Sequence, residues 1–276
     1  MEDCGKISVI MSVYNCEDTI REAIDSILAQ TYENWEFVIC NDCSTDSTFD
    51  ICRSYAEKYP DKFVLVENDI NRKLAYSLNH CLEHATGKYV ARMDGDDRSH
   101  PDRFEKQVQY LAAHPDIDLV GCAAQRFDDS GLHDIYRLEE HPDKYSLYHK
   151  VPFGHAMILT YKRVYDTLNG YVVAKRTERG QDYDLWFRFF HAGFKGDNLQ
   201  EALYDVREDA NAIKRRTFKV RWRTYQTTRM GYKLLNYPIS WRINAFFSVV
   251  IKSLTPFWAQ RLLRKIQAKK ASQEKK

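Results

Sequence analysis

The sequence predicts an α/β fold, in which a doubly wound, mostly parallel sheet is followed by a basic helical appendage. Short apolar runs of strand length alternate with segments of helical periodicity through the first 122 residues, which is typical of parallel strands joined by helices. The charge is unevenly divided, because residues 213–276 contain seventeen Lys and Arg and one acidic residue. That part carries +16 and the first 212 residues carry −14, within a total of +2 for the 276 residues. We therefore expect a main domain over 1–212 and a helical tail over 213–276.

The first half of the chain is the regular part. Its strands are near-continuous apolar runs, as expected for strands buried on both faces, and lie at 7–13, 35–40, 63–66, 88–93 and 118–122. The segments between them repeat apolar residues at helical spacing, with helices that begin near Ile20, Ile51 and Leu74 and a fourth before residue 118. Pro60 and Gly87 follow the second and third helices and end them.

The pattern loosens beyond residue 123. We expect strands at 154–160 and 201–206, and a helix over 181–193 that ends at Gly193. The stretch 125–180 is irregular, and loops of this kind often carry substrate specificity.

Composition excludes several classes of protein. No segment has the ~18–20 uninterrupted apolar residues of a transmembrane helix. The acidic start "MEDCGKISVI" lacks a signal-peptide pattern, which predicts a cytoplasmic protein. The seven cysteines are scattered and odd in number, which favours reduced thiols over a disulfide framework. The "CNDC" segment has redox-motif spacing, but it ends a strand and no second pair could complete a zinc site.

Polar residues follow three of the predicted strands. They are "YN" at 14–15, "NDCSTD" at 41–46 and "DGDD" at 94–97. Ligands of doubly wound sheets bind beyond the carboxyl ends of the strands, so these segments are the candidate site.

The acidic cluster of Asp94, Asp96 and Asp97 requires an explanation, because each carboxylate raises the cost of ionising the others. One alternative is a strand-to-helix turn whose acids cap the next helix. The other is a hard divalent cation, Mg²⁺ or Mn²⁺, shared with a substrate diphosphate. The spacing slightly favours the cation. The sequence has no G-x-G-x-x-G after its first strand and no P-loop, which argues against dinucleotide oxidoreductases and P-loop enzymes.

The other candidate residues each have a structural alternative. Asp42 could receive hydrogen bonds from a base or ribose, while Asp46 could cap the second helix. Asp182 and Asp184 open a helix, where the dipole favours acids, but either could also act as a general base. His155 is isolated, so we expect a hydrogen-bonded structural side chain.

Four ordered motifs together resemble the family 2 glycosyltransferases, inverting enzymes of the Rossmann-like GT-A fold. The motifs are "ISVIMSVYN", "ICNDCSTDST", "YVARMDGDD" and "GQDYDLWFRF", and the resemblance runs from about residue 7 to about 206. It implies transfer of a hexosyl or N-acetylhexosaminyl group from a nucleotide sugar, with UDP favoured, to a glycan or lipid-linked glycan. The pathway implied is polysaccharide biosynthesis of the cell envelope.

The resemblance also implies roles for individual residues. Asp182 would be the general base that deprotonates the acceptor hydroxyl. Asp96 and Asp94 would bind Mn²⁺ or Mg²⁺, and Asp94 would also contact the ribose or diphosphate; Asp97 would assist. The nucleotide pocket would be formed by Asp42, the backbone around Tyr14 and Asn15, and Arg92 near a phosphate.

The sequence departs from the family pattern at two positions. Gln181 precedes Asp182 where Glu is commoner, so a second carboxylate is missing. Lys73 stands where a glycine is often found, which changes the donor pocket or adds a cation near the phosphates. The Q-x-x-R-W motif of processive synthases is absent from the sequence, which favours a single addition.

Two other functions compete with sugar transfer. A nucleotidyltransferase would normally have a basic, glycine-rich loop after its first strand, and "SVYNCEDT" is neither. A nucleotide-sugar-binding scaffold would not need a base, so the presence of Asp182 argues against it.

The tail mixes Lys and Arg with aromatic residues, including Trp241, Phe246, Phe247, Phe257 and Trp258. This composition suits an interfacial helix on anionic lipid, which would place the protein at the inner face of the membrane. The alternative is a helical appendage packed on the domain with a solvated cationic face. RNA binding ranks last, because the acidic domain would repel the strand. The final "KKASQEKK" is expected to be disordered.

Overall fold

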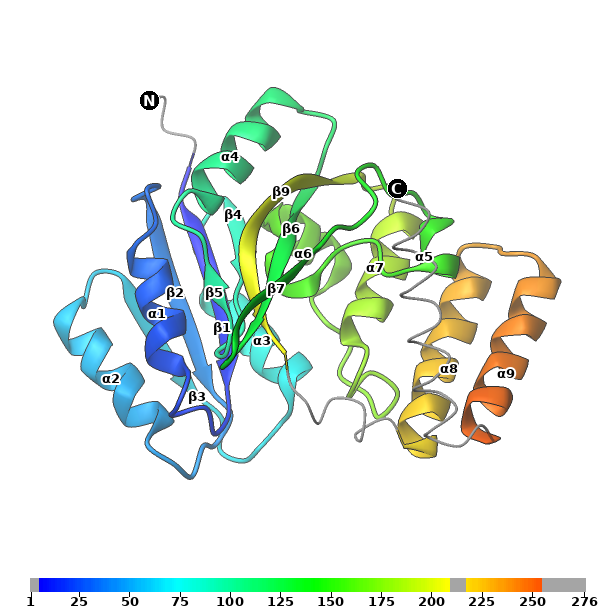
Figure 1. Ribbon diagram of the computed structural model, residues 1–276, viewed down its shortest axis with the longest axis horizontal. Helices are drawn as coiled ribbons and strands as arrows, with labels where there is room; N and C mark the ends of the chain where they lie inside the picture. Colours follow the sequence, from blue (N-terminus) through cyan, green and yellow to red (C-terminus); the bar gives the residue numbers. More distant parts are fainter. Residues whose placement is uncertain (1–4, 209–216, 255–276) are drawn as a thin grey trace.

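The computed structural model describes residues 5–208 and 217–254, which form one mixed sheet with helices on both faces (Figure 1). The nine strands run in the order β3-β2-β1-β4-β8-β6-β9-β5, and β7 pairs with β6. The strands are β1 (Ile7–Val13), β2 (Trp35–Asn41), β3 (Phe63–Glu67), β4 (Tyr89–Arg92), β5 (Arg98–Ser99), β6 (Leu119–Asp128), β7 (Gly131–Tyr136), β8 (Leu159–Tyr161) and β9 (Gly196–Arg207). The helices are α1 (Ile20–Leu28), α2 (Thr48–Lys58), α3 (Leu74–His84), α4 (Arg103–Ala113), α5 (Ser146–His149), α6 (Lys162–Leu168), α7 (Gln181–His191), α8 (Phe218–Leu234) and α9 (Ile239–Leu254).

The sheet has a parallel half and a mixed half. Strands β3, β2, β1 and β4 are parallel, with Val9 opposite both Phe37 and Ala91. Strand β8 then runs antiparallel to both β4 and β6, whereas β6 and β9 are parallel to each other. The predicted α/β class is confirmed, and the antiparallel strands enter through the irregular second half of the chain.

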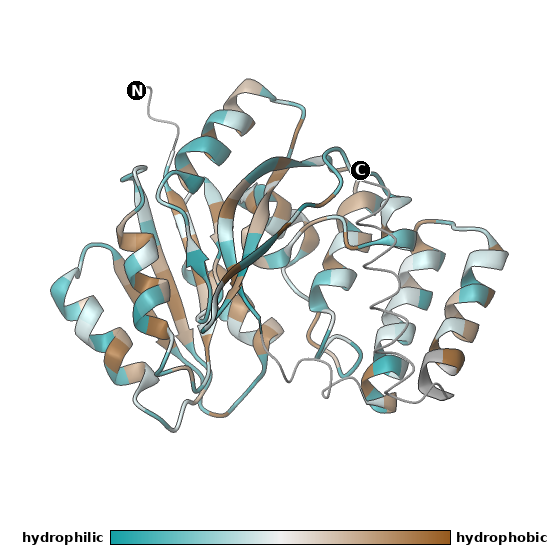
Figure 2. Ribbon diagram, in the orientation of Figure 1, coloured by the Kyte–Doolittle hydropathy of each residue, from teal (hydrophilic) through white to brown (hydrophobic). Residues whose placement is uncertain are grey.

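Two apolar layers cover the sheet, as a doubly wound fold requires. Alternate residues of a strand point to opposite faces, so Val9 and Met11 join one layer and Ile10 joins the other. The first layer includes the apolar faces of α1, α2 and α4, and the second includes those of α3, α6 and α7. Figure 2 shows the neighbouring strands β1 and β2 as largely hydrophobic.

The strand expected over 154–160 is shorter than predicted. Only Leu159–Tyr161 is extended, and His155–Met157 form a single 3₁₀ turn. The carbonyls of Ala156 and Met157 are occupied by α4 side chains, because Arg103 Nη1 donates to the first at 3.3 Å and Gln107 Nε2 to the second at 2.8 Å. These carbonyls are thus bonded to side chains, and neither residue is paired with a described strand.

Strands β6 and β9 are longer than predicted, because each is completed by the other. They pair from Leu119 opposite Gly196 to Phe127 opposite Arg207, with irregular register around Ala123. The sequence pattern did not predict β5, β7, α5 or α6, which lie in or near this part of the chain.

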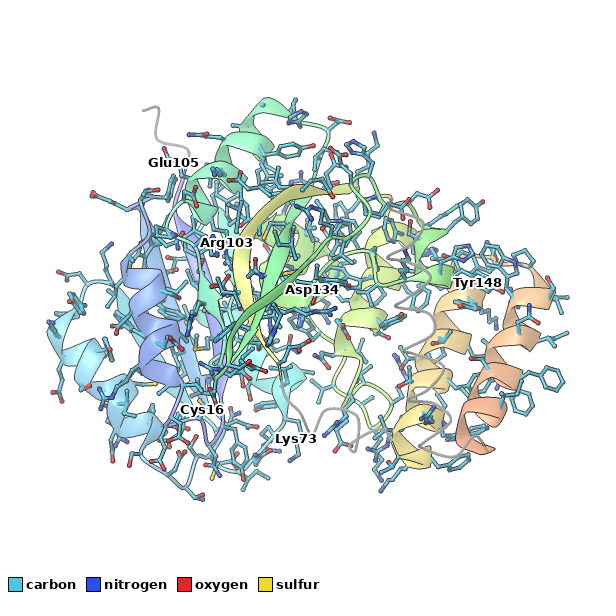
Figure 3. All side chains as sticks on the ribbon, in the orientation of Figure 1. Cys16, Lys73, Arg103, Glu105, Asp134 and Tyr148 are labelled. Carbon is cyan, nitrogen blue, oxygen red and sulfur yellow. The ribbon has the colours of Figure 1, made fainter. Side chains whose placement is uncertain are left out.

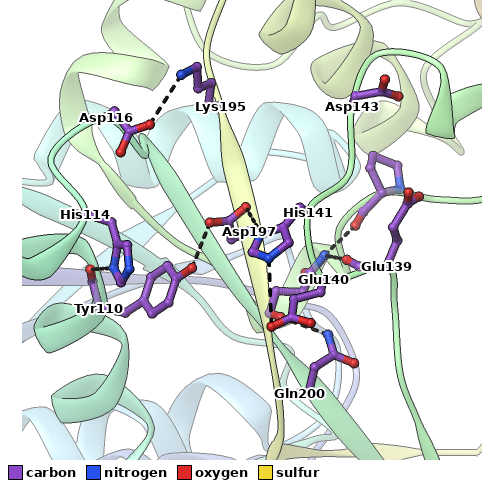
Figure 4. Close-up of polar contacts among 12 residues, drawn as sticks. Tyr110, His114, Asp116, Glu139, Glu140, His141, Asp143, Lys195, Asp197 and Gln200 are labelled. Atoms are coloured by element: carbon purple, nitrogen blue, oxygen red, sulfur yellow. Dashed lines mark hydrogen bonds and ion pairs between the residues drawn. The ribbon is translucent and has the colours of Figure 1, made fainter.

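A polar network holds the loop before α5 against the start of β9 (Figure 4). Asp197 accepts a hydrogen bond from the Tyr110 hydroxyl at 2.8 Å and pairs with His141 Nδ1 at 2.9 Å. The hydrogen bond to Asp197 and the charge of that carboxylate raise the pKa of His141. This irregular segment is thereby fixed relative to the sheet without regular structure of its own.

Helices α8 and α9 lie side by side at the end of the molecule farthest from α2 (Figure 1). Helix α8 packs on α7 at Gly231, where a Cβ atom would lie 2.1 Å from Cδ2 of Phe187. The predicted helical tail is thus present over 218–254, but its boundary at 212, together with Phe257, Trp258 and the final residues, lies outside the described residues. No helix within 5–208 or 217–254 is long and apolar enough to cross a membrane.

Candidate active site

The acidic turn follows β4 at the carboxyl end of the parallel strands. Asp94, Asp96 and Asp97 each bring one carboxylate oxygen within 4.8 Å of the others. The turn rests on the start of α1, where Thr19 Oγ1 donates a hydrogen bond to the Gly95 carbonyl at 2.8 Å. The predicted clustering of the three acids is therefore present in the structure.

Asp94 is neutralised by a buried arginine. Arg92 Nη2 lies 2.5 Å from Asp94 Oδ1, and the Arg92 side chain is only 2% exposed. Burial lowers the pKa of Arg92, but the charge of Asp94 outweighs this and raises the pKa above its ordinary value. The guanidinium is therefore permanently charged. In the structure it contacts Asp94, and its predicted contact with a phosphate stays a prediction.

Asp97 is a buried carboxylate held by the distant strand β9. Its Oδ1 accepts a hydrogen bond from the Arg207 amide at 2.8 Å, and Arg207 Nε donates to the Asp96 carbonyl at 3.1 Å. The Tyr204 hydroxyl accepts from the Asp94 amide at 3.2 Å. Burial and the charges of Asp94 and Asp96 raise the pKa of Asp97 well above its usual range. Strand β9 thus fixes the shape of the acidic turn.

Asp96 is the member of the cluster left open. Its side chain is exposed, and it forms no ion pair with any described residue. Nearby protein atoms and the charge of Asp94 still raise its pKa. Carboxylate oxygens are the ligands that Mg²⁺ and Mn²⁺ prefer, and one divalent cation would compensate the crowded charge. The donor set therefore fits such a cation.

Asp42 organises the loop that leads into α3. It is buried, and it accepts hydrogen bonds from Asn68 Nδ2 at 2.8 Å and from the amides of Arg72 and Lys73 at 2.7 and 2.9 Å. A carboxylate has about four acceptor positions, so one remains for a ligand. Contact between Asp42 and the base of the nucleotide stays a prediction. The structure adds a second role for Asp42, which is to hold the loop before α3.

Lys73 has a backbone conformation that side chains rarely adopt. Its φ of 72° and ψ of 164° lie in a region occupied almost entirely by glycine. Its side chain is exposed beside the site, and the Asp42 carboxylate holds the strained amide. Figure 3 shows Lys73 and Cys16 at the same end of the sheet.

The loops after β1 and β2 are tied together. Asn15 has a left-handed φ of 49°, and its Oδ1 accepts from the Thr45 amide at 2.8 Å. Its own amide donates to Ser44 Oγ at 3.2 Å. The Tyr14 side chain is 50% exposed beside them. The predicted pocket-forming segments therefore adjoin, and they reach the acidic turn through Cys16, whose sulfur would lie 3.2 Å from a Cβ at Gly95.

The two acids at the start of α7 have different surroundings. Asp184 is buried between Arg176 and Arg188, and Arg188 Nε lies 2.7 Å from it. Asp182 has no ion pair with a described residue, and burial raises its pKa, while the charge of Arg92 lowers the pKa and that of Asp94 raises it. Asp184 is thus held by ion pairs, whereas Asp182 is not held so by any described residue, and its role as a general base stays a prediction.

A pocket of about 320 Å³ lies between the acidic turn and the start of α7, and its lining does not include Asp42, Asp96 or Asp182. Its lining includes Asp94, Asp97 and Arg92 from the acidic turn, Gln181 from the start of α7, and His155. His155 hydrogen-bonds the Tyr171 hydroxyl at 2.8 Å, as expected for a structural histidine, and burial together with the Arg92 charge lowers its pKa.

Three residues of the site were not predicted. Tyr204 and Arg207 hold the acidic turn from β9, and Arg126 on β6 lines the pocket. No local motif marks them, because pairing between β6 and β9 is what brings them to the site. The six cysteines of the described residues form no disulfide with one another.

The sequence matches one protein family. The pattern of glycosyl transferase family 2 covers residues 8–168. EpsE of Bacillus subtilis (strain 168), named as a glycosyltransferase, is 50% identical over 218 residues, which cover 79% of this chain and 78% of EpsE. The amylovoran biosynthesis glycosyltransferase AmsE of Erwinia amylovora is 31% identical over 214 residues, covering 76% and 79% of the two chains.

Solved structures share the fold. TarS of S. aureus in complex with UDP-GlcNAc superposes with a TM-score of 0.68 at 19% identity, covering 83% of this chain and 66% of that one. This chain therefore spans about two thirds of the TarS chain. The mannosyltransferase PcManGT of Pyrobaculum calidifontis, in complex with GDP-Man and Mn²⁺, has a TM-score of 0.63 at 21% identity, with coverage of 96% and 80%.

Proposed function

Because the chain belongs to glycosyltransferase family 2 and is a glycosyltransferase, we propose that it transfers one sugar from a nucleoside-diphosphate sugar to an acceptor hydroxyl, with inversion and with a divalent cation. The observation that carries this proposal is the acidic turn. Asp96 alone of its three carboxylates is open and unpaired among the described residues, beside a pocket that the start of α7 also lines.

The residues of the site have complementary roles in this reaction. Asp182 accepts the proton of the acceptor hydroxyl while its oxygen attacks the anomeric carbon and the bond to the diphosphate breaks. The raised pKa of Asp182 suits a base that works near neutral pH. Mn²⁺ or Mg²⁺, held by Asp96 and Asp94, would stabilise the departing diphosphate. Arg92 fixes Asp94, and Asp42 fixes the loop that presents Lys73.

We propose a UDP-linked hexose or N-acetylhexosamine as donor and a glycan or lipid-linked glycan as acceptor, in polysaccharide biosynthesis of the cell envelope. The names of relatives support this, since AmsE is named for amylovoran biosynthesis and TuaG of Bacillus subtilis (strain 168) for teichuronic acid biosynthesis. TarS holds UDP-GlcNAc, whereas PcManGT holds GDP-Man and Mn²⁺.

We also propose that the protein works at the cytoplasmic face of the membrane, which it contacts through residues 213–276. The described part of that tail supports this, because exposed apolar side chains such as Ile239 and Phe247 lie among Lys and Arg residues. Pelleting of the full-length protein with anionic vesicles at low salt is the expected result, and a protein that stays in the supernatant would contradict it.

Calorimetric titration of UDP, with and without Mn²⁺ and beside GDP, tests the donor site. We expect Mn²⁺-dependent UDP binding that Asp96→Asn abolishes and that Asp61→Asn, at an exposed acid on another surface, leaves unchanged. A preference for GDP would keep the mechanism but change the donor. If folded wild-type protein binds neither nucleotide, or if Asp96→Asn binds as tightly as wild type, the metal–diphosphate site is wrong.

A further inference from the structure

A groove between α8 and α9 is a second hollow of the molecule, distinct from the candidate active site. Its volume is about 900 Å³, and its lining comes from both helices and from the loop before α7. Cationic and apolar side chains alternate there: Arg229, Lys233 and Arg242 lie beside Trp222 and Phe246. A helix face that is merely exposed to solvent does not need cationic and apolar side chains together in a concave surface.

The positive charge of the groove is not compensated by the described protein. Residues 217–254 contain no Asp or Glu. Arg176, at the rim, is paired with Asp184. By contrast, the side chains of Arg229, Lys233 and Arg242 form no ion pair or hydrogen bond with a described residue. The Nε atom of Arg242 is shielded from solvent and also lacks a partner. An anion in the groove would supply the partner that this atom and the three cationic groups lack.

Apolar side chains surround the same groove. Met230 is 54% exposed, Ile243 49% and Phe246 39%. Figure 2 shows hydrophobic residues toward the end of α9. Exposed apolar side chains interspersed with Lys and Arg are typical of helices that lie in a membrane interface.

The chemistry of the groove excludes several other occupants. The parts of the chain outside the described residues, 209–216 and 255–276, carry net charges of +2 and +6, so cationic repulsion disfavours them. A nucleic acid would be repelled by the −14 charge of the first 212 residues. An anion joined to a hydrocarbon chain matches both the cations and the apolar rim.

We propose that the α8–α9 groove binds the phosphate headgroup of an anionic membrane lipid through Arg229, Lys233 and Arg242. This inference rests on the proposed membrane contact and assigns it to one site. The groove is also linked to the candidate active site, because Arg176 at its rim pairs with Asp184, two residues from Asp182. Lipid bound there would hold the start of α7 near the membrane that carries a lipid-linked acceptor.

The test compares two triple variants of the full-length protein in vesicle pelleting. The first is Arg229→Gln, Lys233→Gln and Arg242→Gln. The control is Arg53→Gln, Lys58→Gln and Lys195→Gln, which removes the same charge from exposed positions outside α8 and α9. Vesicles of phosphatidylglycerol and of phosphatidylcholine are the probes, and melting curves by circular dichroism establish that both variants are folded.

We expect wild type to pellet with phosphatidylglycerol and not with phosphatidylcholine. Each basic residue at an anionic surface contributes roughly a fivefold factor, so the groove variant should partition about 100-fold more weakly. The control variant should change by less than about threefold.

Four outcomes would overturn the inference. If the groove variant pellets like wild type, or if both variants weaken equally, the membrane contact stands but the groove is not its site. If wild type itself does not pellet, the proposed membrane contact fails as well, while the calorimetric test of the donor site is unaffected. Binding of single-stranded RNA without binding to vesicles would replace the lipid with a nucleic acid.

Discussion

Carboxylates at the two ends of the parallel strands have pKa values shifted in opposite directions. At the amino ends, Glu36 accepts hydrogen bonds from Lys6 Nζ at 2.5 Å, Ser8 Oγ at 2.6 Å and the Thr86 amide at 2.7 Å. Burial alone would raise the pKa of Glu36, but these partners outweigh it and lower the pKa. At the carboxyl ends, nearby protein atoms and the charges of neighbouring acids raise the pKa values of the exposed Asp96 and the buried Asp97.

The difference suggests that the carboxylate at the amino ends stabilises the fold, whereas those at the carboxyl ends serve function. Glu36 is neutralised by its own chain, so the amino ends require nothing further. At the carboxyl ends, Arg92 compensates one of three neighbouring acids, and negative charge remains. Groups left with perturbed pKa values in a pocket are candidates for function. The comparison therefore predicts that substitutions at the carboxyl ends change activity, and that those at the amino ends change stability.

The largest expected effect is on catalysis, at Asp182. A general base contributes about 10²–10⁴-fold, so Asp182→Asn should lower kcat by about 10³-fold with little change in donor KM or thermal stability. The matched variant is Asp184→Asn, which leaves Arg176 and Arg188 without their shared partner and should lower the melting temperature instead. Steady-state kinetics and melting curves of both variants distinguish the roles. Equal loss of kcat without loss of stability in both would contradict the assignment.

The second-largest expected effect is on stability, and it distinguishes Asp94 from Asp96 within the acidic turn. Asp94→Asn leaves Arg92 charged and buried without a charged partner, which should lower the free energy of unfolding by about 3 kcal/mol. Asp96→Asn removes a repelling charge and should not lower it. Urea unfolding in the presence of a chelator measures both values. If Asp96→Asn were the less stable variant, the division of roles between the two acids would be wrong.

At the amino ends, Glu36→Gln should cost about 2 kcal/mol of stability at pH 7, since a charged acceptor is lost. The pKa of Glu36 is lowered by folding, so its contribution is present above the unfolded value of about 4.3 and is lost as the pH falls through the folded pKa. The stability gap between wild type and Glu36→Gln should therefore shrink on acidification. We expect unchanged kcat at pH 7, and a gap that grew in acid would refute this account.

The smallest effect concerns Lys73. Glycine would relieve about 1–3 kcal/mol of backbone strain at φ 72° while adding about 0.5–1 kcal/mol of unfolded-chain entropy, so Lys73→Gly should gain about 1 kcal/mol. If Lys73 lies near the donor phosphates, the same variant should bind UDP more weakly. Arg72→Gly, at a residue without positive φ, should lose stability. A loss in both variants would show that the conformation of Lys73 is not strained.

Local patterns predicted the fold well where they were regular. Strand β1 has its predicted bounds, and β2, β3 and α3 begin where the apolar runs and helical spacing place them. Beyond residue 123 prediction weakened, because β6 and β9 extend through pairing with each other and the Ala156 and Met157 carbonyls are occupied by Arg103 and Gln107. These are contacts between residues far apart in the chain, which no short window contains.

The sequence by itself determined the α/β class, the order of its first elements and the gathering of polar segments at one edge of the sheet. Composition and periodicity are local properties, and parallel strands must end at a common edge. The tertiary structure decided how each charge is used. It pairs Asp94 with Arg92, gives Asp97 to the Arg207 amide, and leaves Asp96 and Asp182 unpaired among the described residues. Burial and distance set these differences, and the chain acquires both only when it folds.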